Sequence, residues 1–85
     1  MTREEDIDAT LGRILAKTRV ILIPLERVHQ LLCEFIPDAT EAETAAELDF
    51  LVKKGWVTAT PTHTGSTLRY QLSAEGILAV RRREF

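Results

Sequence analysis

Few side chains in this sequence have types and spacing suited to chemistry. The 85 residues include one cysteine, Cys33, and two histidines, His29 and His63. We expect His29 at the surface or half-buried, because no ligand partner is evident at metal spacing. Cys33 is expected to be a small core hydrophobe, because no cation that would activate its thiol is evident. Nucleophile motifs, phosphate loops and catalytic carboxylate pairs are missing, so we expect no enzyme, cofactor or metal site.

A second set of side chains could contact phosphate groups. Cations displace counterions from phosphates, and hydroxyls can hydrogen-bond phosphate oxygens. The run Arg81–Arg83 is the one dense basic segment. It could be a solvated helix end, a phosphate contact or part of an inter-subunit salt bridge, and it is too short to establish nucleic-acid binding. The candidate nucleic-acid contacts elsewhere in the chain are Lys53, Lys54, His63, Thr64 and Arg69.

Composition sets limits on where these side chains can act. The chain has 11 Lys and Arg against 13 Asp and Glu, a net charge of −2, whereas a small nucleic-acid binder is usually basic. An apolar fraction of 45% is typical of a globular protein, and the length indicates a single domain over 1–85. The longest apolar run, Val20–Ile23, is too short to cross a membrane. The polar start predicts no signal peptide, and the single cysteine favours a cytoplasmic location.

Capping residues and apolar spacing predict four helices. Thr2 and Thr40 each precede a glutamate by three residues, which is the spacing of a capping box. Gly55 is a helix stop, and Ser73 can cap a last helix. Apolar residues at helical spacing follow the first cap, at Ile7, Leu11, Ile14 and Leu15. The expected helices span residues 3–18, 25–35, 41–54 and 74–84.

The remaining apolar segments predict strands. Val20–Ile23 is short and mostly β-branched, which favours a short buried strand. Residues 56–60 have strand composition, and residues 67–72 alternate between apolar and polar side chains. A loop of Pro, Gly, Ser and Thr joins these two runs. We therefore expect a β-hairpin over 56–72.

The element order and two sequence segments resemble a winged helix-turn-helix domain. The segments are AELDFLVKKGWVTAT, which resembles the end of a winged-helix third helix, and LRYQLSAEGILAV, which resembles the close of the wing in bacterial repressors of the MarR and PadR types. Small prophage-encoded winged-helix proteins are also similar. The resemblance covers about residues 5–80. It implies an α+β fold with an added C-terminal helix and a role as a DNA-binding, transcription-regulator-like protein.

The charge of the expected third helix opposes duplex binding. The resemblance implies that the helix over 41–54 enters the major groove and that the hairpin loop lies near the minor groove or backbone. Segment 38–54 carries five carboxylates against two lysines, a net charge of −3. Readers of base edges usually present Arg, Lys, Asn or Gln there. Any DNA contact would then fall to Lys53, Lys54, Arg69 or the termini.

The alternative function is a protein-interaction module that binds no nucleic acid. An aromatic residue on a bed of small residues is a common interface anchor, although Phe50 could instead belong to the core beneath the hairpin. The apolar stripes of the first and last helices offer more surface than a thin core consumes. Together with the resemblance, this predicts a homodimer. The candidate protein-interaction residues are Ala42, Ala46 and Phe50, with Glu43, Glu47 and Lys53 at their rim.

Overall fold

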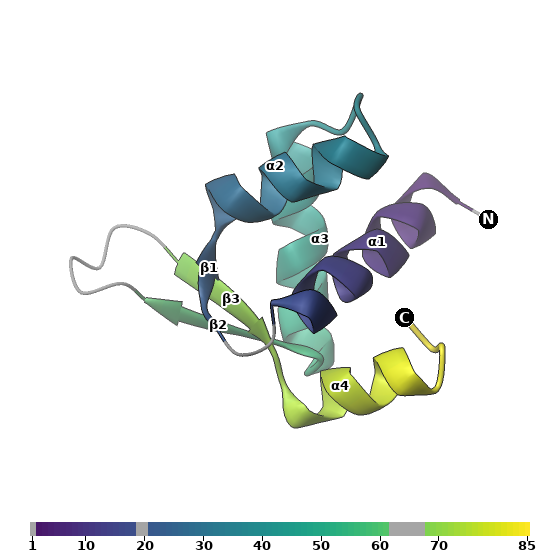
Figure 1. The fold of residues 1–85 in the computed structure, drawn as a ribbon, viewed down its shortest axis with the longest axis vertical. Helices are drawn as coiled ribbons and strands as arrows, with labels where there is room; N and C mark the ends of the chain where they lie inside the picture. Colours follow the sequence, from purple (N-terminus) through teal and green to yellow (C-terminus); the bar gives the residue numbers. More distant parts are fainter. Residues whose placement is uncertain (1, 19–20, 62–67) are drawn as a thin grey trace.

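Four helices and a three-stranded antiparallel sheet form the α+β fold of the described residues (Figure 1). The computed structural model describes residues 2–18, 21–61 and 68–85. The predicted sites His63 and Thr64 lie outside these ranges. The elements are α1 (Arg3–Lys17), β1 (Ile23–Pro24), α2 (Leu25–Phe35), α3 (Glu41–Lys54), β2 (Val57–Pro61), β3 (Leu68–Leu72) and α4 (Ala74–Arg81).

Local signals set the bounds of the helices. The Thr2 hydroxyl accepts the Glu5 N–H at 3.1 Å at the start of α1. Thr40 and Glu43 form the reciprocal capping box of α3, which ends at left-handed Gly55 with a φ of 90°. Helices α2 and α3 have the bounds expected from the sequence, and α1 ends at Lys17, one residue early.

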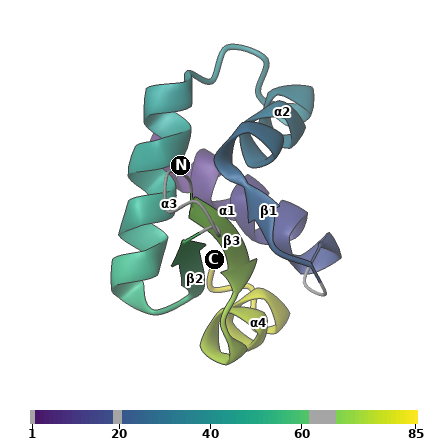
Figure 2. The same ribbon diagram turned by 90° about the vertical axis from the view of Figure 1, so that its left-hand side faces the viewer.

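The sheet order is β1-β3-β2, so β3 lies in the centre. Tyr70 of β3 lies opposite Ile23 on one side and Ala59 on the other. Figure 2 shows α3 along one side of the domain, α2 on the other and α4 beyond the end of the sheet. The core between helices and sheet is apolar, with Leu11, Leu32 and Leu48 each at 0% exposure.

Two expected elements are shorter than predicted. Of the expected strand Val20–Ile23, the structure describes residues 21–23: Ile23 lies in β1, which continues to Pro24, whereas Ile21 and Leu22 are exposed rather than buried. The reason is that β1 pairs with just two residues of β3. The last helix stops at Arg81 instead of residue 84. The Glu84 N–H bonds the Ala79 carbonyl at 2.9 Å, in a turn that requires a positive φ at Arg83.

Ser73 and Gly76 attach α4 to the segment that follows α3. The Ser73 hydroxyl donates to the Gly55 carbonyl at 2.6 Å and accepts the Gly76 N–H at 3.0 Å. The Ser73 N–H donates to the Trp56 carbonyl at 3.0 Å. A Cβ at Gly76 would overlap that same carbonyl oxygen. The serine and glycine of the LRYQLSAEGILAV segment therefore have a packing role.

The core of a single chain buries the whole apolar stripe of α1. Ile7, Leu11, Ile14 and Leu15 are all buried without a second copy. The α1 stripe therefore leaves no surplus apolar surface exposed. The apolar surface of this helix gives no support to the expected homodimer. On α4, Leu78 is 45% exposed. None of the described helices is long and apolar enough to cross a membrane.

Candidate interaction face on α3 and the adjoining pocket

The cations expected to contact phosphate lie on two elements, α3 and β3. Lys53 Nζ pairs with Asp49 Oδ2 at 3.0 Å, one turn back on α3. Lys54 Nζ lies 3.9 Å from the centroid of the Trp56 ring. Arg69 is exposed on β3, in the hairpin. Both lysines thus already have partners within the chain.

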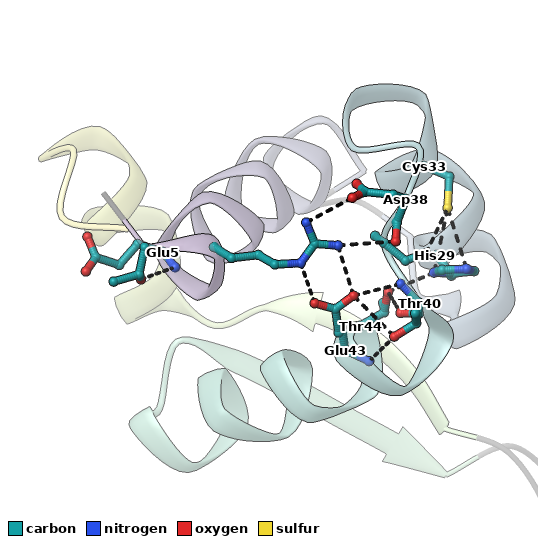
Figure 3. A network of polar contacts seen from close by, with 10 residues as sticks. Glu5, His29, Cys33, Asp38, Thr40, Glu43 and Thr44 are labelled. Carbon is teal, nitrogen blue, oxygen red and sulfur yellow. Dashed lines mark hydrogen bonds and ion pairs between the residues drawn. The ribbon is translucent and has the colours of Figure 1, made fainter.

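Arg3 joins the start of α1 to the start of α3 through Asp38 and Glu43, which are labelled in Figure 3. Its Nε donates to Glu43 Oε2 at 2.6 Å, and its Nη1 donates to Asp38 Oδ2 at 3.3 Å. Glu43 also accepts the Thr40 N–H at 3.0 Å. These contacts, with the Arg3 hydrogen bond first, lower the pKa of Glu43 to about 2 and raise that of Arg3. Glu43 was expected at the rim of an interaction surface, but it belongs to this inter-helix contact.

A pair of acidic residues lies at a second contact between α1 and α3. Asp8 in α1 and Glu47 in α3 carry interacting carboxyl groups. Burial is the first cause that raises the pKa of Asp8, and Glu47 is the next, so the pKa reaches about 7. Asp8 Oδ1 is buried and has no hydrogen-bond partner within the described residues. Glu47, like Glu43, therefore turns toward α1.

The exposed side of α3 differs from the expected set because both glutamates turn toward α1. Phe50 is 48% exposed, so it does not belong to the core. Ala42 and Ala46 are exposed on preceding turns of the same side. We call this surface the outer α3 face. It consists of Ala42, Ala46, Asp49, Phe50 and Lys53.

Next to this face lies a cavity of about 290 Å³ that we call the aromatic pocket. Its aromatic side chains come from α3, the start of the hairpin and the segment after α4. The Trp56 and Phe85 rings lie 4.9 Å apart between centroids and are tilted by 38°. The pocket is lined by Glu5, Asp8, Phe50, Leu51, Lys54, Trp56, Glu84 and Phe85.

Lys54 shows that the wall of the aromatic pocket accepts positive charge. Its ammonium lies over Trp56 and is 5.6 Å from the Phe50 centroid. An aromatic ring attracts a cation at such distances through its negative face. Glu5, Asp8 and Glu84 surround the same cavity, so carboxylates outnumber the single lysine there. The pocket is chemically suited to a cation.

His29, Thr44 and Cys33 form a contact that the sequence reasoning missed (Figure 3). Thr44 is fully buried, and its hydroxyl donates to the Thr40 carbonyl at 3.1 Å. His29 Nδ1 and Thr44 Oγ1 lie 2.8 Å apart in a hydrogen bond whose donor depends on the imidazole tautomer. Cys33 Sγ lies 3.5 Å and 3.9 Å from the two ring nitrogens of His29. A sulfur at nearly equal distances from both nitrogens does not lie along the in-plane hydrogen-bonding direction of either one. The approach of Cys33 to His29 is therefore a packing contact.

The His29–Cys33 spacing of four residues on α2 was the signal for this contact. Cys33 is half-buried rather than a full core residue. In the described part of the chain, no three His, Cys, Asp or Glu side chains are grouped to hold a metal ion. The His29–Thr44 hydrogen bond instead connects α2 to α3 and satisfies a buried hydroxyl.

Two further cavities lie along α1 and α2, with volumes of about 270 and 420 Å³. Both are lined by Arg13 and by Phe35, which is 57% exposed. Within the described ranges, the buried side-chain oxygen that lacks a partner is on Asp8, in the aromatic pocket. The aromatic pocket is therefore the stronger candidate for a ligand site.

No protein-family model matches the chain, and no curated protein or solved structure matches it. Its function must be inferred from the outer α3 face and the aromatic pocket.

Proposed function

We propose that this chain is a winged-helix-like module that binds a protein partner through the outer α3 face. The element order and the β1-β3-β2 sheet are compatible with a winged helix that carries an extra C-terminal helix. The observation that carries the proposal is Phe50. It is a large aromatic side chain, 48% exposed, with Ala42 and Ala46 exposed beside it. Exposed aromatic residues surrounded by small residues are favoured as interface anchors.

Charge favours this function over duplex DNA binding. The outer α3 face carries one acid and one base, and these pair with each other. A helix in the major groove needs donors for base edges and cations for phosphates. Lys54, at the end of the same helix, already lies over an aromatic ring. This helix has little with which to contact a polyanion.

A photo-cross-linking experiment tests the proposal. A photoreactive amino acid at position 46 should produce one discrete cross-linked species in cells, which mass spectrometry then identifies. Phe50→Ala should abolish this species and leave the circular dichroism spectrum unchanged. Leu78→Ala is the matched control, because Leu78 is an equally exposed apolar residue at 45% on α4. A species at twice the 9.6 kDa chain mass would identify the partner as a second copy.

Two results would overturn the proposal. One is a cross-link at position 46 that persists in Phe50→Ala, or that Leu78→Ala removes equally. The other is binding to a labelled random DNA duplex in fluorescence anisotropy, strongest at low salt. Phosphate-driven binding must weaken steeply as salt rises, so the salt series distinguishes DNA binding from other contacts.

A further inference from the structure

We propose that the aromatic pocket receives an arginine side chain from a basic segment of the protein partner. This inference rests on the proposed function, because Phe50 belongs both to the outer α3 face and to the pocket wall. A partner bound to the outer α3 face would therefore reach the mouth of the pocket. The group that enters the pocket would be a guanidinium.

The first support is the aromatic wall. Trp56 already holds a cation over its ring, since Lys54 Nζ lies 3.9 Å from the ring centroid. Phe85 meets Trp56 at 4.9 Å between centroids, so the wall continues beyond the part that Lys54 covers. A planar guanidinium stacks on such rings more effectively than an ammonium does. This is the reason for choosing arginine over lysine.

The second support is the unpartnered oxygen. Asp8 lines the pocket, and its Oδ1 is buried and accepts no hydrogen bond within the described residues. A buried polar atom without a partner is costly, so a donor that enters the pocket and displaces the groups covering this oxygen gains a hydrogen bond. Glu47 lies next to Asp8 and adds negative charge. A guanidinium has five N–H donors and carries the opposite charge.

The third support is the balance of charge around the cavity. Glu5, Asp8 and Glu84 line it, against Lys54 alone, and of these acids Glu84 also lies 4.0 Å from Arg82 Nη1. Lys54 is on α3 and reaches its place over Trp56 with a flexible side chain, which can move aside. Arginine would then replace lysine on the ring and bring a second cation to a site with an excess of carboxylates.

Trp56 is the one tryptophan of the sequence, so its fluorescence reports directly on the pocket. The probe is the blocked peptide Arg-Gly-Arg-Gly-Arg, titrated into the full chain at low salt and at pH 8. The control peptide replaces each arginine with citrulline, which keeps the shape and removes the charge. The arginine peptide should change the Trp56 emission to saturation, and the citrulline peptide should not.

Matched variants separate the pocket from general electrostatics. Asp8→Asn should weaken binding about tenfold, the cost of one charge-assisted contact, whereas Asp6→Asn on the same helix should change it by less than about twofold. Lys54→Met should strengthen binding, because it vacates the ring, whereas Lys53→Met removes the same charge outside the pocket and should have a smaller effect.

The proposal fails if the arginine peptide leaves Trp56 emission unchanged. It also fails if the citrulline peptide binds equally, or if Asp6→Asn weakens binding as much as Asp8→Asn. Should these results occur while the cross-link at position 46 still depends on Phe50, the partner-binding function stands and the arginine site is wrong. If the unsubstituted chain forms no cross-link at position 46 while the arginine peptide still binds, the proposed function is overturned and an arginine pocket remains in the chain.

Discussion

Asp8 in α1 and Glu47 in α3 carry interacting carboxyl groups at the edge of the core, and burial together with Glu47 raises the pKa of Asp8 to about 7. Glu4 adds to the repulsion, and Lys54 opposes it. Glu5 and Glu84 line the same cavity. The contact between α1 and α3 at this point therefore depends on pH.

The first prediction follows from this pair. The pKa of Asp8 rises from 3.8 to about 7 on folding, so the folded state holds a proton that the unfolded state releases. Stability should fall as pH rises from about 4 to about 7, and then level off. Asp8→Asn should remove this slope and be more stable than the parent at pH 8 by about 1–2 kcal/mol, after allowance for solvent screening of a half-buried group. Urea unfolding followed at several pH values measures the difference, and an unchanged slope in the variant would contradict the prediction.

The Arg3–Glu43 contact predicts the opposite pH dependence in acid. The pKa of Glu43 is lowered to about 2, so its contribution to stability is complete above its ordinary value of 4.5 and is lost as pH falls toward 2. Arg3→Gln should lower the melting temperature at pH 7 and have little further effect near pH 2. A scan of melting temperature against pH for the parent and Arg3→Gln checks this. Arg27→Gln, a change at an exposed arginine outside this contact, is the control.

Gly76 predicts a large loss of stability when it gains a side chain. A Cβ at this position would overlap the Trp56 backbone carbonyl, and backbone cannot move aside as a side chain can. Gly76→Ala should cost about 2–3 kcal/mol, although alanine favours helices. Chemical denaturation measures this cost. Arg81→Ala, an exposed substitution in the same helix, should have a much smaller effect.

The backbone conformation of Arg83 predicts that a glycine at this position would stabilise the chain. Arg83 is a non-glycine residue with a φ of 59°, in the turn that ends α4. A side chain costs about 1 kcal/mol in this conformation, whereas glycine adopts it freely. Arg83→Gly should therefore stabilise the chain by about 0.5–1 kcal/mol. Its comparison is Arg82→Gly, one residue earlier at a negative φ, which should give no gain. A fall in melting temperature for Arg83→Gly would show that its side chain makes a contact worth more than the backbone cost.

The parts of this fold that could be predicted from the sequence have local causes. The bounds of α3 follow from Thr40, Glu43 and Gly55, which act within one or two turns of the helix. Within the expected strand Val20–Ile23, the prediction was wrong at Ile21 and Leu22, because burial there depends on how far β1 pairs with β3, which is a tertiary property. Residue type alone says nothing about that length.

The candidate site was predicted less well, for a similar reason. Phe50 and the two alanines are on one side of α3 by helical periodicity alone. The orientation of Glu43 and Glu47 depends on how α1 packs against α3, so their roles as partners of Arg3 and Asp8 could not be inferred from spacing. The aromatic pocket unites Phe50, Trp56 and Phe85 from separate segments, and such a grouping exists only after folding.

The Phe85 ring rests on Gly12 of α1, where a Cβ would meet it at 2.5 Å, and its other neighbour is Trp56. Removing this one residue would therefore act as a large-to-small substitution at the edge of the core. A chain that lacks residue 85 would have the backbone of α1 uncovered at Gly12.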